Sequence, residues 1–168
     1  MGPPAPGPGP TTGRPTLRAR TATHRDADTV GRLLHDFNTE FGAATPTADA
    51  LGQRFRRLLA MPEVLVVLAE DDDAPAGFAF LTLRPTPYDD GPLAQLEELY
   101  VRPGLRDQGI GTALLTVAVD GVRTRGAREM HIDVDEVDVD TRRFYERHGF
   151  TNIEPGGEYR MLCYLREF

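Results

Sequence analysis

The residues of this 168-residue chain best suited to chemistry lie between Leu96 and Leu115, where a strand-like sequence runs through a tight turn into a helical one. Gly109 and Gly111 stand at the predicted start of the helix, so their backbone N–H groups are open to an anion because no side chain covers them. The unpaired donors and the dipole of a helix N-terminus favour a pyrophosphate there. Arg106 begins the turn and could add a positive charge. A GxG sequence alone is equally typical of an ordinary tight turn.

Two motifs in this order resemble the signatures of one enzyme superfamily. Arg106-x-x-Gly109-x-Gly111 after a strand is similar to the acyl-CoA-binding motif of the GNAT superfamily of N-acetyltransferases. The stretch from Asp138 to Phe150, which ends in Tyr-x-x-x-Gly-Phe, resembles the second signature of that superfamily. The resemblance covers residues 17 to 165 and implies transfer of an acetyl group from acetyl-CoA to a primary amine, by direct attack in a ternary complex.

The resemblance also implies roles for three side chains. Tyr145 matches the family position whose hydroxyl lies near the CoA sulfur, and it is expected to act as the general acid. Glu97 is expected to act as the base and Glu98 as the amine binder. Adjacent strand residues face opposite sides of a sheet, so only one glutamate points into the site unless a β-bulge is present. The alternatives are a half-buried core tyrosine and solvent-exposed or arginine-paired glutamates.

Acyl-CoA contacts follow from the same resemblance. Backbone groups at the end of the strand are expected to pair with the pantetheine arm, and N–H groups of the turn and helix start with the pyrophosphate. Asp107 departs from the usual glycine, and Asp138 departs from the usual asparagine but can still cap a helix. The expected contacts are Leu99, Tyr100, Val101, Arg106, Asp107, Gln108, Gly109, Ile110, Gly111, Thr112 and Asp138.

The acceptor is expected to be a small cationic amine or a peptide amine. In this superfamily specificity comes from segments that correspond to residues 37–47 and 84–92, and the second contains Tyr88, Asp89 and Asp90. An aromatic ring with two carboxylates is compatible with a cation, although such a segment is also an ordinary turn. A non-catalytic acyl-CoA sensor of the same fold is the alternative function.

Hydrophobic periodicity and turn residues predict the elements that position these groups. The fold class is α/β, a GNAT-like three-layer α-β-α domain over residues 16–168 with a mixed central sheet splayed at the acyl-CoA site. Residues 1–15 contain six of the 14 prolines and are predicted to be a disordered tail. The predicted strands are 16–20, 64–70, 77–83, 93–101, 130–134 and a terminal hairpin of 151–153 with 159–165; the predicted helices are 26–41, 47–60, 109–125 and 139–148.

Composition excludes several other classes. All 19 basic residues are arginine, so Schiff-base chemistry and the lysine of a phosphate loop are excluded. The formal charge of −7 and the scattered arginines disfavour a nucleic-acid partner. The single cysteine, Cys163, allows no internal disulfide and is predicted to be buried in a terminal strand. With no paired metal-ligand spacing and no long apolar stretch, we expect no metal, no membrane partner and a cytoplasmic location, with a homodimer as an open option.

Overall fold

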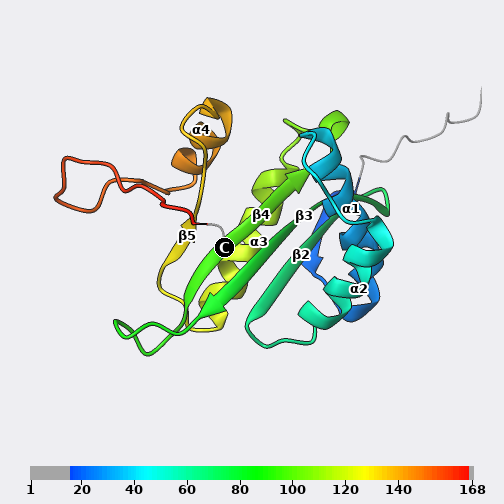
Figure 1. The fold of residues 1–168 in the computed structure, drawn as a ribbon, viewed down its shortest axis with the longest axis horizontal. Coiled ribbons are helices and arrows are strands. Elements are labelled where there is room, and N and C mark those ends of the chain that lie inside the picture. Colours follow the sequence, from blue (N-terminus) through cyan, green and yellow to red (C-terminus); the bar gives the residue numbers. More distant parts are fainter. Residues whose placement is uncertain (1–15, 167–168) are drawn as a thin grey trace, which may run out of the picture.

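The computed structural model describes residues 16–166, and within them a mixed sheet has the strand order β1-β2-β3-β4-β5 (Figure 1). The first four strands pair antiparallel, and β5 pairs in parallel with β4. The predicted tail, residues 1–15, lies outside the described residues. The strands are β1 Arg18–Thr21, β2 Val64–Asp71, β3 Ala74–Arg84, β4 Leu93–Val101 and β5 Met130–Ile132.

Helices cover both faces of the sheet, which confirms the predicted three layers (Figure 1). Val66 and Leu68 of β2 pack toward α1 and α2, whereas Leu65 and Val67 pack toward α3. This burial on both sides explains why β2 is apolar without alternation. The helices are α1 Ala27–Glu40, α2 Ala48–Leu58, α3 Ile110–Thr124 and α4 Val139–Arg147, with short 3-10 turns η1 His24–Asp26 and η2 Pro103–Leu105.

The sheet opens between β4 and β5. The two strands pair only over Ala94–Leu96 of β4 and Met130–Ile132 of β5, although β4 continues to Val101. Among the described residues, no strand pairs with this edge of β4 beyond Leu96. The backbone of residues 97–101 is therefore open along one edge, and the predicted splay is confirmed.

The predicted terminal hairpin is wrong as a pair of sheet strands. Residues 151–166, which follow α4, do not join the sheet (Figure 1). Their only β-type pairing within the described chain is an isolated bridge between Ile153 and Arg160. The predicted strand 130–134 also ends early, at Ile132. Cys163 is exposed rather than buried, because the apolar alternation that predicted its burial requires a sheet that this segment does not join.

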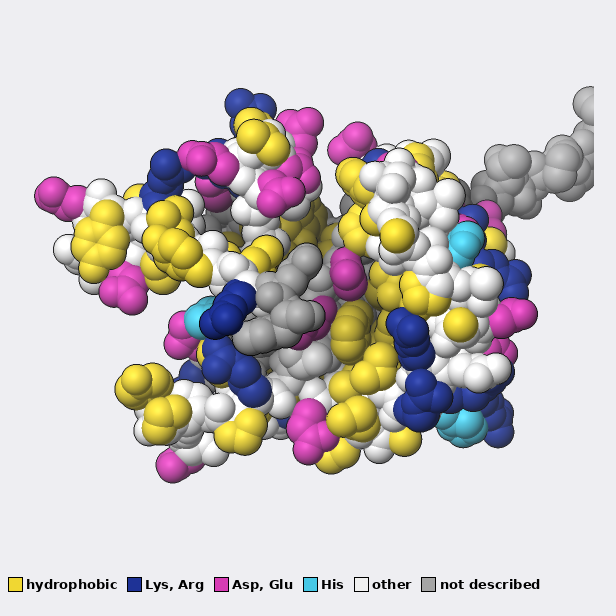
Figure 2. All heavy atoms as spheres, viewed as in Figure 1, with side chains coloured by type: hydrophobic (Ala, Val, Ile, Leu, Met, Phe, Trp, Pro, Cys, Tyr) yellow, Lys and Arg dark blue, Asp and Glu magenta, His cyan; other side chains and the backbone are white. Residues whose placement is uncertain are grey.

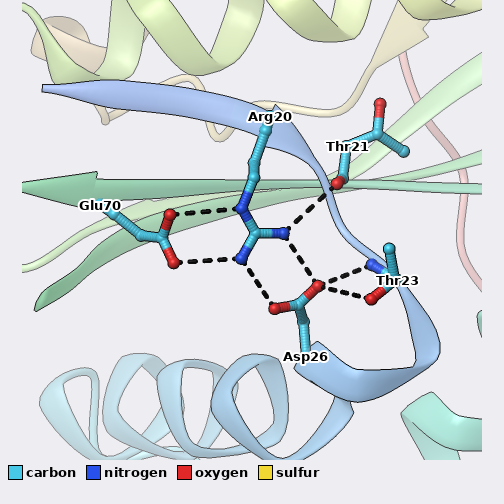
Figure 3. Close-up of polar contacts among 5 residues, drawn as sticks. All are labelled: Arg20, Thr21, Thr23, Asp26 and Glu70. Carbon is cyan, nitrogen blue, oxygen red and sulfur yellow. Dashed lines mark hydrogen bonds and ion pairs between the residues drawn. The ribbon is translucent and has the colours of Figure 1, made fainter. Parts of the chain in front are cut away.

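An ion network ties the start of the fold together (Figure 3). Arg20 of β1 donates to Asp26 of η1 over 2.8 Å and to Glu70 of β2 over 3.0 and 3.2 Å. The backbone and hydroxyl of Thr23 donate to the same Asp26 carboxylate over 2.7 and 3.0 Å. These bonds, chiefly that from Arg20, hold the pKa of Asp26 well below its usual range. The network therefore fixes the entry into α1.

We expect Asp26→Asn to lower the free energy of unfolding by about 2 kcal/mol near neutral pH, since charge-assisted bonds are lost in a largely buried place. Because the folded-state pKa is lowered, the aspartate stabilises the fold above its unfolded pKa of about 4, and that contribution disappears as the pH falls further. The difference in free energy of unfolding between wild type and variant should therefore become smaller as the pH is lowered. Chemical denaturation over a pH series measures it. The exposed Asp120→Asn is the matched control, and a gap that is constant with pH would contradict the account.

Candidate functional site

A β-bulge in β4 brings both sequence-predicted carboxylates to one face of the sheet. Phe80 lies opposite Glu98 and Leu81 lies opposite Leu96, so Glu97 is the extra residue. Phe80 packs with the core between the sheet and α1 and α2, which places Glu98 on that face. The Thr82 hydroxyl on the same face donates a hydrogen bond to Glu97. The bulge therefore removes the alternation that would have separated the two glutamates.

The two glutamates have different surroundings. Burial first, and the charge of Glu97 second, raise the pKa of Glu98. Glu97 is more exposed and is held by Thr82. Among residues 16–165, no arginine or histidine lies within ion-pair distance of either carboxylate. The pair is thus a negative site that a cation could satisfy, with one unusually basic member.

Tyr145 comes from α4, which follows β5 on the other side of the opening between β4 and β5; this opening is called the cleft below. Its side chain is 5% exposed and packs edge-on against Phe144 and Phe150, with ring centroids 5.1 and 5.4 Å away. Burial, followed by the charges of Asp138 and Glu98, raises the pKa of Tyr145. A tyrosine in this state stays protonated and can donate.

The turn before α3 has the geometry of an anion site. Gly109 is the N-cap with φ of 85°, and α3 begins at Ile110, so the first N–H groups of the helix have no intrahelical partner. An added Cβ on Gly111 would lie 3.4 Å from the ring of Phe144, which shows how closely α3 and α4 meet there. The Gln108 side chain folds back onto the Gly104 carbonyl over 3.2 Å. Backbone donors, rather than side chains, are what this turn offers.

Asp107 occupies a strained position in that turn. Its φ is 61°, in the left-handed region that favours glycine, and it is exposed. Aspartate tolerates this region better than most residues because its side chain can bond locally. The carboxylate nevertheless adds negative charge close to the helix start.

Arg106 and Arg102, which follow β4, are engaged by α1. Arg106 donates to the Val101 carbonyl over 3.0 Å and forms an ion pair of 2.8 Å with Glu40, while Arg102 lies 3.4 Å from Asp36. Sequence reasoning missed the two acids of α1, although their i,i+4 spacing places them on one helix face. Three of these residues, Asp36, Glu40 and Arg102, line a hollow of about 640 Å³. Its other lining residues are His35, Thr39, Tyr100, Pro103, Gly104 and Leu105.

The remaining predicted residues have local roles in the structure. Asp138 accepts a bond of 3.1 Å from the Thr141 backbone, so the predicted cap of α4 is confirmed. Asp89 accepts from the Gly91 backbone over 3.2 Å and lies 3.5 Å from Arg128, as a turn residue would. Leu99, Tyr100 and Val101 lie on the open part of β4.

Taken together, the cleft offers three functions at one place: a carboxylate of raised pKa, a protonated phenol, and unpaired backbone groups along β4 and at the start of α3. These are the requirements for moving one proton off a nucleophile and another onto a leaving group beside an extended anionic ligand. In the described part of the chain, no cluster of three or more histidine, cysteine or acidic residues is arranged to hold a metal ion. None of the helices between residues 16 and 166 is long and apolar enough to cross a membrane.

Known proteins are similar to this chain in sequence and in fold. The family model for the acetyltransferase (GNAT) family matches residues 30–150. Over 92 residues the chain is 36% identical to aminoglycoside N(6')-acetyltransferase type 1 of Klebsiella aerogenes, a match that covers 54% of this chain and 60% of that protein. The chain thus spans less than two thirds of the curated relatives that it matches.

Solved structures agree on the fold. A protein of Arthrobacter sp. FB24 that is described as an acetyltransferase is 48% identical, with a TM-score of 0.83 over 96% of this chain and 100% of that one. Aminoglycoside N-acetyltransferase AAC(6')-Iy, solved in complex with CoA, is 19% identical with a TM-score of 0.73, over 91% of this chain and 99% of that one. At this lower identity the likeness shows the fold alone.

Proposed function

The chain belongs to the acetyltransferase (GNAT) family, and on that premise we propose that it transfers an acetyl group from acetyl-CoA to the primary amine of a small cationic acceptor. The observation that carries the proposal is the bulge in β4, which turns Glu97 and Glu98 to one face of the sheet, where the charge of Glu98 contributes to the raised pKa of Tyr145. An acyl-CoA sensor needs the ligand site but has no use for an acid and a base beside it.

The residues present fit acetyl-CoA as the donor substrate. The unpaired edge of residues 97–101 suits the pantetheine arm, whose amides need a strand-like partner. Uncovered N–H groups from Gln108 to Thr112 suit the pyrophosphate. Arg106 would add its charge only if it left Glu40, so we expect backbone donors to do most of the binding.

Glu98 is the better base in this geometry, and Glu97 the better amine binder, the reverse of the assignment that the sequence favours. The acceptor amine is protonated at neutral pH and must lose a proton before its nitrogen can attack the thioester carbon. A carboxylate with a raised pKa takes that proton more readily, and the pKa of Glu98 is raised because it is half-buried and lies beside Glu97. Glu97, exposed and fixed by Thr82, would hold the cationic group.

Tyr145 completes the proton balance. As the new C–N bond forms and the C–S bond breaks, the sulfur leaves as a thiolate that needs a proton. The phenol is protonated and lies at the cleft, so it would donate its proton there. Glu98 holds the proton that the ammonium loses before attack. The nitrogen loses a second proton as the amide forms, and that proton passes through water to the phenolate of Tyr145, which restores the phenol. Glu98 then releases its proton to water, so one proton is released for each acetyl group transferred.

A cationic acceptor is supported by charge and by relatives. Both glutamates lack a cationic partner among residues 16–165, and the chain carries a formal charge of −7. Aminoglycoside acetyltransferases recur among the relatives in sequence and in fold. We therefore propose a small polycationic amine, with aminoglycosides as the first compounds to test and peptide amines as the second.

We expect Asp107→Gly to tighten acetyl-CoA binding by about three- to tenfold, because it removes a carboxylate near the pyrophosphate and relieves the left-handed backbone. Asp107→Asn separates the causes, since it removes the charge and keeps a residue that tolerates this conformation. Calorimetric titration with CoA at low and high salt measures both effects. The increase in CoA affinity should be smaller at high salt. Equal affinity in all three proteins would contradict the proposal that this turn binds the pyrophosphate.

Release of free thiol from acetyl-CoA, measured with a panel of aminoglycosides, polyamines, amino acids and peptides, tests the proposed function. We expect at least one cationic amine to stimulate release well above the rate without acceptor. If acetyl-CoA binds and no amine stimulates release, the sensor alternative stands instead.

A further inference from the structure

The cleft between β4 and β5 is closed at its inner end by the last pair of the parallel ladder. That pair is Leu96 of β4 and Ile132 of β5, and both side chains pack against the core on the α3 side of the sheet. From there residues 97–101 run along the open edge for about 16 Å, at about 3.3 Å per residue, toward the turn before α3. The inner end of the cleft therefore lies at the opposite end of this edge from the anion site, with apolar side chains on its α3 side.

A polar bridge joins the two strands on the other face of the sheet at the same place. Gln95 of β4 lies opposite Thr82 of β3 and His131 of β5. Thr82 lies opposite Val64 of β2, which packs in the core that α1 and α2 cover. Paired residues face the same side of a sheet, so Gln95 points away from α3, and its amide donates to the Asp133 carboxylate over 3.4 Å. This bridge between Gln95 and Asp133 therefore spans the inner end of the cleft.

The carboxylate of Asp133 also has a partner in the C-terminal segment. The charge of Asp133 first, and a hydrogen bond to it, raise the pKa of the Cys163 thiol. Asp133 is therefore held by donors from two different parts of the chain. Figure 2 views the sheet from the face opposite to α3, as Figure 1 does, and on this face apolar and acidic side chains lie between α4 on one side and α1 and α2 on the other.

The acyl group of a bound acyl-CoA would lie at this inner end. In the proposed function the pyrophosphate lies at the start of α3 and the pantetheine arm lies along residues 97–101, so the arm runs toward Leu96. The thioester then comes beside Glu97 and Glu98, and the carbon atoms beyond its carbonyl point toward the bridge. An acetyl group has one such carbon atom, whereas a butyryl group has three. Each further carbon atom needs space that the bridge and the end of the ladder occupy.

The cleft cannot lengthen without breaking bonds. A longer acyl group must either part the bridge or open the last pair of the ladder, which is only three pairs long. Leu96 of that pair is 1% exposed, so opening it would also bring core surface into contact with water. The bridge is a single bond near the surface, so a side-chain substitution can remove it while the ladder and the core stay in place.

We propose that the bridge between Gln95 and Asp133 restricts the acyl group of the bound acyl-CoA to acetyl. The inference rests on the proposed function, because it takes the acyl-CoA to lie along β4. It goes beyond that function by assigning the choice of acyl group to two side chains that take no part in the proton transfers. If the bridge served only to hold β5 against β4, its removal would lower stability and leave the choice of acyl group unchanged.

Values of kcat/KM for acetyl-, propionyl- and butyryl-CoA, measured with one amine, test the proposal. We expect the wild type to prefer acetyl-CoA to butyryl-CoA by about 10²-fold, and Gln95→Ala and Asp133→Ala each to reduce that preference by about tenfold. Asp133→Asn keeps the size of the side chain and an oxygen that accepts from Gln95, so it should keep the preference. Arg56→Ala removes an ion pair between α1 and α2, outside the cleft, and is the matched control that should also keep it.

Calorimetric titration of the resting protein with acetyl-CoA and butyryl-CoA, in the absence of an amine, measures the same selectivity without acetyl transfer. Gln95→Ala should bind butyryl-CoA about tenfold more tightly than the wild type does, and acetyl-CoA with nearly equal affinity. Circular dichroism and thermal unfolding establish that each variant is folded.

The outcomes separate this inference from the proposed function. Variants that lose rate or affinity with all donors alike overturn the inference, because the bridge then serves stability alone. A wild type that uses all three donors equally overturns it as well, and acetylated amine in that experiment leaves the proposed function intact. If no amine is acetylated but Gln95→Ala gains affinity for butyryl-CoA, the proposed function fails and the restriction of the acyl group stands.

Discussion

Tyr145→Phe is expected to lower kcat by about 10²-fold while the KM for acetyl-CoA stays nearly constant. The substitution removes the hydroxyl that would protonate the departing thiolate and keeps the ring that packs against Phe144 and Phe150. Burial and the nearby charges of Asp138 and Glu98 keep the phenol protonated, so the wild-type enzyme has a donor over the whole neutral range. Steady-state kinetics with the best acceptor from the panel measure the effect.

Tyr159→Phe is the matched control for this loss, because it removes a hydroxyl from an exposed tyrosine outside the cleft. It should leave kcat unchanged. A Tyr145→Phe variant that turns over at the wild-type rate would remove this residue as the acid, and water would then protonate the sulfur. A donor thiol of lower pKa should reduce the difference between wild type and Tyr145→Phe, because a better leaving group needs less help.

Glu98→Gln is expected to lower kcat/KM by about 10²-fold near neutral pH, because the amide cannot accept a proton from the amine. In the wild type, activity should fall as the pH drops through the raised pKa of Glu98, since the base works only when it is deprotonated. The variant should lose this acidic limb. Profiles of kcat/KM against pH, measured for wild type and variant with one acceptor, show the change directly.

Glu97→Gln is the comparison that separates the two roles. It occupies the adjacent position and keeps its bond with Thr82 available, so it should raise the KM for the amine more than it lowers kcat. Its acidic limb should remain, shifted to lower pH because the charge of Glu97 contributes to the raised pKa of Glu98. If Glu97→Gln loses the limb and Glu98→Gln keeps it, the roles are those that the sequence favours.

The sequence alone predicts the sheet, the layers and most helix ends, because strong local signals coincide with tertiary burial. The run from Val64 to Ala69 is apolar on both sides and lies buried between helices on both faces. Gly109 ends the turn before α3 with a positive φ, as its position in the motif implies. Asp138 caps α4 through its own side chain. In each case the residue type and its neighbours in sequence determine the result.

The bulge at Glu97 and the separation of residues 151–166 from the sheet could not be predicted in this way. A bulge depends on the register between β3 and β4, and the sequence leaves open which of two adjacent glutamates is the extra residue. Residues 159–165 alternate between apolar and other side chains as a strand does. A strand also needs a neighbouring strand to pair with, and within the described residues this segment forms only the bridge between Ile153 and Arg160. The ion pair between Arg106 and Glu40 joins elements that are 66 residues apart, so no local pattern indicates it.

The most direct test of the account is to measure acetylated amine and released CoA together, by mass spectrometry and thiol titration, with wild type, Glu98→Gln and Tyr145→Phe. We predict that the wild type forms one acetylated amine for each CoA released, and that both variants lose the two products in parallel by about 10²-fold. CoA release without acetylated amine, or equal product from all three proteins, would contradict an acetyl transfer that depends on this carboxylate and this phenol.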